Sequence, residues 1–417
     1  MIAVVAVWLA LALPATELVV GPGAPYATLT AAVAAATPGA TIRVRAGIYR
    51  EPVIEVRVPG LTILGDGWPV LDGEGARELL TIRADDVTVR GLMFMNTGTS
   101  QMEDRAAVRV VDAARCVIEH NRFRDALFAI YLQRAPGCAV TDNDIRGSGG
   151  DETRNGNGVH LWHSPGVTVA RNTISGQRDG IYFEFSRSAI ATDNVSTGNR
   201  RYGLHFMFSD SCAYERNTFR ANGAGVAVMY SKGITMRGNG FLDARGSAAY
   251  GLLLKDITDG EISGNRFAGN STGMYLDGAS RLTIADNEFH ANGWGVRLMA
   301  NTEDTRFTGN SFAGNAFDVA TNSRTLRSTF TGNWWDAYRG YDLDRDGMGD
   351  VPFHPVRLFS LIVERHPGSL VLLRSPVTGV LDAAERVFPA LTPSLADARP
   401  LMRPPSRITD PLMEAPR

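Results

Sequence analysis

Large apolar residues alternate with other residues in short runs that each contain a glycine at or near the start. The runs NGVHLW, DGIYFE, YGLHFM, AGVAVM, YGLLLK, TGMYLD and WGVRLM share this pattern. Alternation with a period of two, bounded by Gly, Asn and Asp, predicts β-strands with one buried face. The first and third positions after each glycine are the predicted buried positions, as Ile181 and Phe183 are in the second run.

A second signature recurs about half a repeat away from these runs: a small or polar residue, Asn, any residue, then an apolar one. Its asparagines are spaced by 22, 29, 22, 23, 22, 26, 22, 23 and 23 residues. A near-constant period with occasional insertions indicates a solenoid. Short strands at this period predict an all-β fold, a single-stranded right-handed parallel β-helix. The asparagines are Asn121, Asn143, Asn172, Asn194, Asn217, Asn239, Asn265, Asn287, Asn310 and Asn333.

We interpret this asparagine series as structural. An inward-turned Asn at a corner of the coil can tolerate a left-handed φ, and its amide can bond with the Asn one rung along. The side chains would then satisfy buried polar groups in a continuous ladder.

The three cysteines follow the same repeat, because Cys116, Cys138 and Cys212 each lie five residues before a signature Asn. Val167 and Ala189 occupy this column in other repeats. The cysteines are therefore predicted to be inward-facing small hydrophobic residues. Cys116 and Cys138 lie on adjacent rungs, close enough for a disulfide, so a bridge between them stays open.

The chain divides into four predicted segments. Residues 1–15 have the short apolar run and small residues of an export signal, although a buried strand is the alternative. Residues 16–355 are the predicted β-helix. Residues 356–390 switch to helix-like patterning, with apolar pieces too short to span a bilayer. Residues 391–417 are Pro-rich and predicted to be disordered.

The composition narrows the choice of partners. The chain has 42 basic and 44 acidic residues, so its formal net charge is −2 and no basic field points to nucleic acid or anionic lipid. The 44 glycines and 8% aromatic residues favour a turn-rich β-fold over disorder.

The second and fourth positions after each glycine are predicted to point outward, and they bring candidate metal ligands together. Neighbouring side chains on such a face are about 4.8 Å apart across rungs and about 6.6 Å apart along a strand. Imidazole and thioether ligands select soft or borderline metals, Cu(I) first among them. The same strip could instead dock a partner, with Met as an adaptable contact. The candidates are His160, His163, Glu184, His205, Met207 and Met229.

An acidic loop, YDLDRDGMGD, follows the last rung. Carboxylates at alternate positions with a glycine for the sharp turn resemble a Ca²⁺-binding loop. The EF-hand pattern is incomplete, since no Glu stands at the twelfth position, and a plain acidic turn is the alternative. The candidate ligands are Asp342, Asp344, Asp346 and Asp350.

Several longer strings carry a resemblance to a known family. GNGVHLW, RDGIYFEF, RYGLHFMF, NGAGVAVMYS, GSAAYGLLLK, NGWGVRL, FDVATN, GNWWDAYRGYDLDRDGMGDVPF and FPALTP are similar to strings of NosD, the nitrous oxide reductase maturation family. The resemblance covers nearly the whole exported chain. The segment ATLTAAVAAATPGATIRVRAGIYRE also resembles the entry segment of the wider pectin-lyase-like group, in which an amphipathic helix caps the first rung.

The resemblance implies a periplasmic, non-enzymatic accessory protein in the maturation of the copper centres of nitrous oxide reductase. Its implied partners are an ABC transporter made of the NosF ATPase and the NosY permease, the copper chaperone NosL, and the apo-reductase. Residues 356–390 would be the transporter-docking segment. The outer strip would transfer Cu(I) transiently or dock the reductase.

The main rival is a carbohydrate-active or carbohydrate-binding β-helix protein, because Trp162, Tyr182 and Tyr275 could stack on sugars. The acidic residues of the outer columns, Glu184 and Asp277, are not on neighbouring rungs, which argues against a glycosidase.

A glycosidase site on another face of the coil stays an alternative, since the insertion DETRNGNG contains Asp151 and Glu152. A third interpretation is a structural adaptor that holds transporter and reductase together without touching metal.

Overall fold

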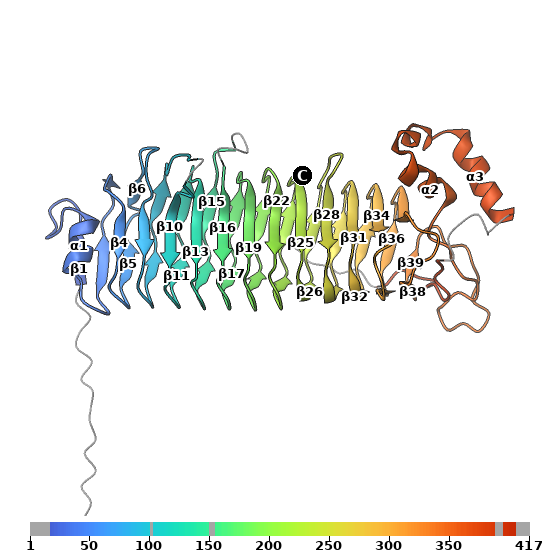
Figure 1. The fold of residues 1–417 in the computed structure, drawn as a ribbon, viewed down its shortest axis with the longest axis horizontal. Coiled ribbons are helices and arrows are strands. Elements are labelled where there is room, and N and C mark those ends of the chain that lie inside the picture. The colour runs from blue at the N-terminus through green and yellow to red at the C-terminus, as the bar shows by residue number, and fades with distance from the viewer. Residues whose placement is uncertain (1–16, 101–102, 150–154, 388–394, 406–417) are drawn as a thin grey trace, which may run out of the picture.

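The computed structural model describes residues 17–100, 103–149, 155–387 and 395–405. Within them the chain coils into a parallel β-helix whose axis runs the length of the molecule (Figure 1). Each turn adds one strand to each of three sheets, so a rung holds three strands, where the sequence indicated at least two. The predicted all-β parallel β-helix is confirmed. The predicted export signal, residues 1–15, lies outside the described residues.

Sheet A has 14 strands, and each of the three cysteines lies directly before one of them. Its strands are β1 (Glu17–Val20), β2 (Thr41–Val44), β5 (Thr62–Gly65), β8 (Thr88–Arg90), β11 (Val117–Glu119), β14 (Ala139–Thr141), β17 (Thr168–Ala170), β20 (Ile190–Thr192), β23 (Ala213–Glu215), β26 (Lys232–Arg237), β29 (Thr258–Ser263), β32 (Ser280–Ala285), β35 (Arg306–Thr308) and β38 (Thr329–Thr331).

Sheet B has 13 strands, most of them three residues long. They are β3 (Ile48–Tyr49), β6 (Val70–Asp72), β9 (Met93–Met95), β12 (Arg122–Arg124), β15 (Asp144–Arg146), β18 (Thr173–Ser175), β21 (Val195–Thr197), β24 (Thr218–Arg220), β27 (Gly240–Leu242), β30 (Arg266–Ala268), β33 (Glu288–His290), β36 (Ser311–Ala313) and β39 (Trp334–Trp335).

Sheet C has 12 strands, and seven of them are the glycine-containing runs. The strands of sheet C are β4 (Ile54–Val56), β7 (Leu80–Ile82), β10 (Ala106–Val111), β13 (Phe128–Gln133), β16 (Asn157–Trp162), β19 (Asp179–Glu184), β22 (Tyr202–Met207), β25 (Ala224–Met229), β28 (Tyr250–Lys255), β31 (Thr272–Asp277), β34 (Trp294–Leu298) and β37 (Phe317–Thr321).

The core is a set of inward columns in which the same kind of side chain stacks rung upon rung. Phe241, Phe267, Phe289 and Phe312 form such a stack, with ring centroids 4.7 to 4.8 Å apart and all four rings at most 1% exposed. Burial of such apolar surface against the rungs above and below is what holds a solenoid together.

The cysteines are buried and free, as small core residues. The backbone N–H of Cys116 donates to the Sγ of Cys138 at 3.2 Å, so the two adjacent thiols pack without a covalent bond. The disulfide that the sequence left open is therefore not formed.

The asparagine ladder is present as predicted, and its members are 0 to 2% exposed. In a typical step, the Oδ1 of Asn217 accepts from the backbone N–H and the Nδ2 of Asn194, at 3.0 and 2.9 Å. The Nδ2 of Asn217 also donates to the carbonyl of Ala191 at 2.9 Å. Each side chain thus satisfies buried groups on neighbouring rungs.

One detail of the ladder prediction is wrong. The left-handed φ falls on the residue before each ladder asparagine, for example +55° at Asp193 and +52° at Arg216. The preceding residue makes the sharp turn at each corner. The side-chain amide of the asparagine then donates and accepts hydrogen bonds along the axis of the coil.

Helix α1 (Leu29–Ala35) caps the first rung, as the resemblance implied. The helix buries its own residues Leu29, Ala32 and Val33. The carboxylate of Glu51 accepts the backbone N–H groups of Leu29 and Thr30, both at 2.8 Å, which satisfies donors at the start of the helix.

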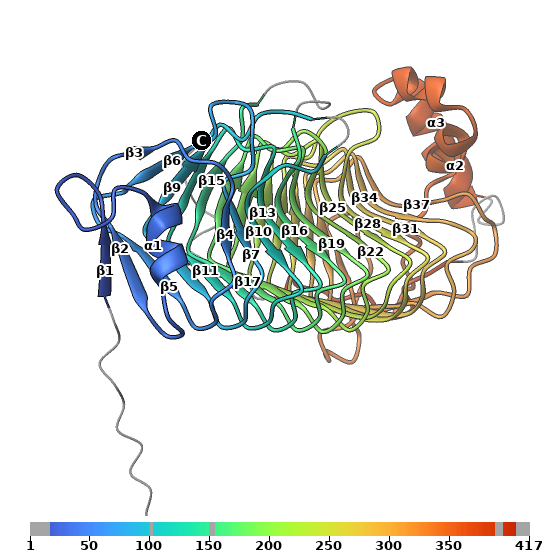
Figure 2. The same ribbon diagram turned by 60° about the vertical axis from the view of Figure 1, so that its left-hand side comes forward.

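The predicted helical extension is also present, as α2 (Leu358–Arg365), the 3₁₀ helix η2 (Pro367–Leu372) and α3 (Pro376–Val387). Figure 2 shows α2 and α3 standing beyond β37 at the end of the coil. Phe359 packs on Phe317 of β37, with ring centroids 6.0 Å apart. Among the described residues, no helix has the length and apolar character needed to cross a bilayer.

The prediction of a disordered tail from residue 391 is wrong for residues 395–405, which return to the end of the coil. Asp397 is fully buried and bridges to Phe330, and Leu401 bridges to Trp334. The physical reason is that the last rung leaves backbone and side-chain donors that need a buried acceptor, and the tail supplies one.

Candidate metal-binding site

The candidate site lies on the outer face of sheet C, on four consecutive strands from β16 to β25. The register pairs His160 with Tyr182, Tyr182 with His205, and His205 with Ala227. These residues form the middle column of the face.

A second column runs beside the first. Trp162 pairs with Glu184, Glu184 with Met207, and Met207 with Met229. The column alignment deduced from the glycine-containing runs is therefore correct.

The two histidines of the middle column are not exposed, contrary to the expectation for outward positions. His160 is 7% and His205 is 5% exposed. Their rings are covered by aromatic neighbours: the His160 centroid lies 4.5 Å from Tyr131 and 4.8 Å from Tyr182. The His205 centroid lies 4.8 Å from Tyr182 and 4.7 Å from Tyr202. The two side chains point outward but are not exposed to solvent, because large side chains on either side cover the imidazoles.

The hydrogen-bond network indicates the tautomer of His160. Its Nδ1 lies 3.5 Å from the Nδ2 of Asn157, whose Oδ1 accepts from Arg178 at 3.1 Å. The amide nitrogen of Asn157 therefore faces His160 as the donor, and Nδ1 is the acceptor. The Nε2 of His160 carries the proton and lies 4.0 Å from a carboxylate oxygen of Glu184.

His205 has no comparable partner. Both of its ring nitrogens are buried, and neither has a hydrogen-bond partner within the described residues. A buried, unpaired polar atom costs about 1–3 kcal/mol, and a bound ion or water at His205 would remove this cost.

Burial sets the charge states at the site. It lowers the pKa of His160 to about 3 and that of His205 to about 4, assisted by Arg178 near both rings. Both imidazoles are therefore neutral at pH 7, which is the form that binds metals. Burial also raises the pKa of Glu184, and it raises the pKa of Tyr182 to about 12, so the Tyr182 phenol keeps its proton.

The thioethers of Met207 and Met229 are partly exposed and lie on adjacent strands. The Tyr182 hydroxyl donates to the Met207 sulfur at 3.6 Å. The Tyr182 ring also separates His160 from His205, with about the same 4.8 Å spacing on each side. The two histidines therefore cannot bind one ion together, since metal–nitrogen bonds are about 2.0–2.1 Å long.

His163 belongs to a feature that the sequence analysis missed, an exposed aromatic ladder formed by His163, Phe185, Phe208 and Tyr230. Successive centroids are 4.9, 5.1 and 5.1 Å apart, and the rings lie within 13° of parallel. All four residues have φ between +48° and +55°, which is rare for bulky side chains. The available signal was an aromatic residue directly after the last strand residue in four successive repeats.

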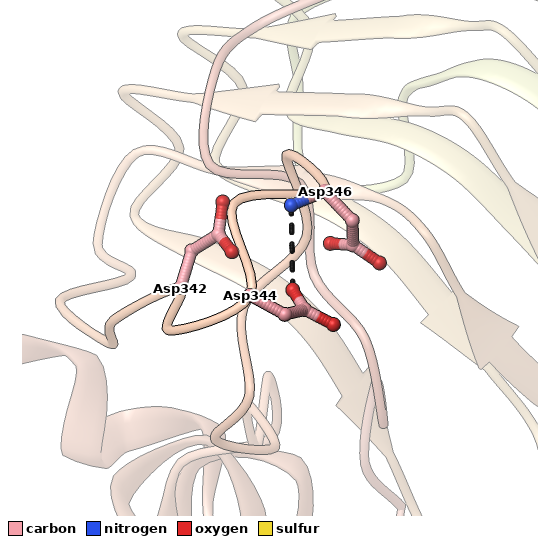
Figure 3. Close-up of side chains that lie close together, drawn as sticks. All are labelled: Asp342, Asp344 and Asp346. Carbon is pink, nitrogen blue, oxygen red and sulfur yellow. Dashed lines mark hydrogen bonds between the residues drawn. The ribbon is translucent and has the colours of Figure 1, made fainter.

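The acidic loop brings three of its four predicted residues together. Oxygens of Asp342, Asp344 and Asp346 lie within 4.8 Å of one another (Figure 3). The backbone N–H of Asp346 donates to Asp344 at 3.3 Å, and Arg399 pairs with Asp346. Asp350 lies outside this group and accepts from the backbone N–H of Leu343 at 2.6 Å.

Among the described residues, that loop is the single group of three or more His, Cys, Asp or Glu side chains close enough to share an ion. The outer face of sheet C therefore offers a metal site only if its thioethers take part. Asp151 and Glu152, the acidic residues of the insertion, lie outside the described residues.

Comparison with known proteins gives two kinds of match. Residues 143–340 match the sequence profile of a family described as "Periplasmic copper-binding protein (NosD)". Two relatives, from Pseudomonas aeruginosa and Stutzerimonas stutzeri, are each named "Probable ABC transporter binding protein NosD". They are 33% and 30% identical to this chain over 81% of its length and over 82% and 81% of their own.

Solved structures share the fold at low identity. The A-module of a mannuronan C-5 epimerase from Azotobacter vinelandii has a TM-score of 0.62 and 16% identity, over 74% of this chain and 93% of that chain. The catalytic unit of an α-1,3-glucanase from Streptomyces thermodiastaticus has a TM-score of 0.59 and 14% identity, over 74% and 65%. At such identities the likeness concerns the fold alone.

Proposed function

Because the chain belongs to the NosD family, we propose that it is a periplasmic accessory protein that handles copper during maturation of the copper centres of nitrous oxide reductase. The observation that best supports this role is the pair of partly exposed thioethers of Met207 and Met229 beside the buried imidazole of His205 on sheet C. That imidazole has no hydrogen-bond partner among the residues that the structure describes. Soft donors in this arrangement suit a transient cuprous ion. The protein acts by binding and transfer rather than as an enzyme.

The partners in this proposal are an ABC transporter formed by the NosF ATPase and the NosY permease, the chaperone NosL, and the apo-reductase. Residues 1–15 serve for export. The names of the relatives, which describe ABC transporter binding proteins, support the first of these associations.

The helical extension is the proposed docking segment for the transporter. It presents apolar side chains to solvent while α2 anchors it to the coil through Phe359 and Val363. Exposed apolar patches of this kind mark interaction sites. The exposed residues are Leu370, Val371, Leu372, Val377 and Val380, of which Val371 is 85% exposed.

A pull-down tests this docking. Val371→Asp combined with Val380→Asp is expected to remove transporter from the complex without changing the fold of the coil. Ile190→Asp with Val195→Asp, on residues of sheets A and B exposed to 42% and 40%, is the matched control and should leave the complex intact. Unchanged transporter binding by the first variant would contradict the assignment.

The copper role is tested by the metal content of the reductase. In cells that carry the His205→Leu, Met207→Leu double variant, the reductase is expected to lack copper. His290→Leu, on the exposed surface of sheet B, serves as the control. Normal copper delivery by the double variant would refute the role of this face.

The aromatic ladder adds no stacking surface to the carbohydrate-binding alternative, which rests on Trp162, Tyr182 and Tyr275. The rings of Phe185 and Phe208 are covered on both faces by their neighbours in the ladder, so their edges and not their faces meet the solvent. A base or a sugar ring stacks on the face of an aromatic side chain and not on its edge. The ladder therefore suits contact with an apolar protein surface better than with a glycan.

A further inference from the structure

We propose that the cuprous site consists of three donors only: a ring nitrogen of His205 and the sulfurs of Met207 and Met229. This assignment rests on the proposed copper-handling function and makes it more specific. His160, His163 and Glu184 are thereby excluded from the set of ligands.

The strand register brings these three donors together. His205 and Met207 lie two residues apart on β22, on the same face, and Met229 pairs with Met207 on β25. The corresponding side-chain spacings are about 6.6 Å along a strand and about 4.8 Å across strands. Methionine has three rotatable side-chain bonds, so both sulfurs can turn toward one ion. Ala227 pairs with His205 on β25, so no long side chain occupies that neighbouring position.

His205 is the better of the two buried imidazoles for this purpose. Neither of its nitrogens has a partner within the described residues, so either can bind the ion and no hydrogen bond is lost. In His160 the Nδ1 is held by the Asn157 amide and the proton is on Nε2. Metal binding at either nitrogen of His160 would break that arrangement, and the Tyr182 ring blocks its approach to the thioethers.

The donor set also selects the ion. Two thioethers and one neutral imidazole are soft or borderline ligands, which favour Cu(I) over hard cations such as Mg²⁺ or Mn²⁺. The hydroxyl of Tyr182 donates to the Met207 sulfur and so holds that thioether in place. Tyr182 is therefore a positioning residue.

The burial of the three donors suits transfer rather than permanent storage. The imidazole is 5% exposed, whereas both thioethers are partly exposed. Phe208 and Tyr230 directly follow the two methionines and stack on each other with their centroids 5.1 Å apart. The sulfurs are thus reached from the surface at the edge of an apolar strip, where a partner could give or take the ion.

The test is an anaerobic titration of the exported chain with Cu(I), supplied as its acetonitrile complex, in competition with a chromophoric cuprous chelator. Met207→Leu and Met229→Leu conserve side-chain volume, and each is expected to weaken Cu(I) binding at least tenfold. His205→Leu is expected to do the same. X-ray absorption at the copper edge should report two sulfur and one nitrogen ligand in the wild type.

Matched controls separate this proposal from the general copper function. His160→Leu and Met402→Leu are expected to change the affinity less than twofold. Loss of binding in His160→Leu with normal binding in the methionine variants would overturn the three-donor site and leave the copper function standing. A wild-type chain that binds no Cu(I) would overturn both, and an absorption spectrum without sulfur ligands would overturn the assignment alone.

Discussion

The carboxylate of Asp397 ends the asparagine ladder by accepting hydrogen bonds from Asn333, a residue 64 positions earlier in the chain. One oxygen accepts from the backbone N–H and the Nδ2 of Asn333, at 2.9 and 3.0 Å, and from the Nε1 of Trp335 at 3.2 Å. The other accepts from the backbone N–H of Gly332 at 3.0 Å. The returning tail is thus the acceptor for the open end of the coil.

Replacing Asp397 by Ala should therefore loosen the last rungs. Four buried donors would lose their acceptor, at about 1 kcal/mol or more for each bond. We expect a loss of about 4 kcal/mol in the local free energy of opening, because a solenoid can fray from one end. Hydrogen exchange at the amides of Gly332 and Asn333 measures it.

Asp397→Asn is the matched variant, since it keeps one acceptor oxygen. In it the amides of Gly332 and Asn333 should exchange at an intermediate rate. Unchanged protection of Gly332 in Asp397→Ala would show that the tail does not stabilise this end.

Removing an asparagine from the interior of the ladder is expected to reduce stability by as much as the Asp397 substitution. Asn217→Ala removes two accepted bonds from Asn194 and two donated bonds, to Ala191 and Asn239. At about 1 kcal/mol per bond the expected loss is about 4 kcal/mol. Chemical denaturation checks this, with Asn301→Ala as the control. Asn301 is exposed and donates to Asp277 on the surface, so equal effects of the two substitutions would contradict the structural role of the ladder.

Glu364 should hold the helical extension on the coil. Its carboxylate accepts from the Nε and the Nη2 of Arg297 at 2.9 and 2.8 Å, and its side chain is 6% exposed. Removal of Glu364 would leave Arg297 without this partner at 31% exposure, so the cost should lie below the ~3–5 kcal/mol of a fully buried pair. Glu364→Ala is expected to increase proteolysis between α2 and α3 while the thermal unfolding of the coil stays unchanged. Equal protease resistance of variant and wild type would count against this anchor.

Asp318 should make stability depend on pH. Burial raises its pKa to about 6, with a further rise from Asp336, even though Asn315 donates to it at 3.1 Å. The folded carboxyl keeps its proton up to about pH 6, whereas the unfolded one loses it near its ordinary pKa of 3.8. The free energy of unfolding therefore falls as the pH rises through this window.

Asp318→Asn keeps the shape of the side chain and removes its titration. The variant should gain stability over the wild type at pH 8 and not at pH 4, as measured by thermal melting at both values. A gain of the same size at both pH values would show that the carboxyl does not titrate as described.

The acidic loop is expected to bind Ca²⁺ through Asp342, Asp344 and Asp346. A cation that binds only the folded loop raises the unfolding midpoint in proportion to the logarithm of its concentration. We expect millimolar Ca²⁺ to raise the midpoint of the wild type. Asp344→Asn should abolish the shift, whereas Asp350→Asn, outside the cluster, should retain it. Absence of any shift in the wild type would favour the plain acidic turn.

Periodicity alone was enough to predict the coil, its inward columns and the asparagine ladder, because a solenoid repeats the same contacts on every rung. The column of Glu184, Met207 and Met229 could be deduced in the same way, since a fixed register places equivalent positions side by side. The N-terminal cap could be recognised from the family resemblance, and the helical extension from the change of pattern after residue 356.

Burial on the outer face could not be deduced in this way. His205 was predicted to face solvent. The rings that cover it are Tyr182, at the same position one rung away, and Tyr202, directly before the glycine of its own strand. The residues at both positions differ from rung to rung, so the period does not predict the cover. The hydrogen bonds that distinguish His160 from His205 depend on Asn157 and Arg178, whose side chains meet only after the strands are stacked.

Contacts between distant parts of the chain could not be predicted from the sequence either. The local pattern of each repeat determined which side of its strands faces the core, because alternation is a property of neighbouring residues. Only the tertiary structure decided that Asp397 reaches Asn333 and that Arg297 binds Glu364. It also decided that both ring nitrogens of His205 lack a hydrogen-bond partner in the described part of the chain. These contacts depend on how side chains pack and on segments tens of residues apart that come together in the fold. A pattern that repeats over short distances in the sequence does not specify them.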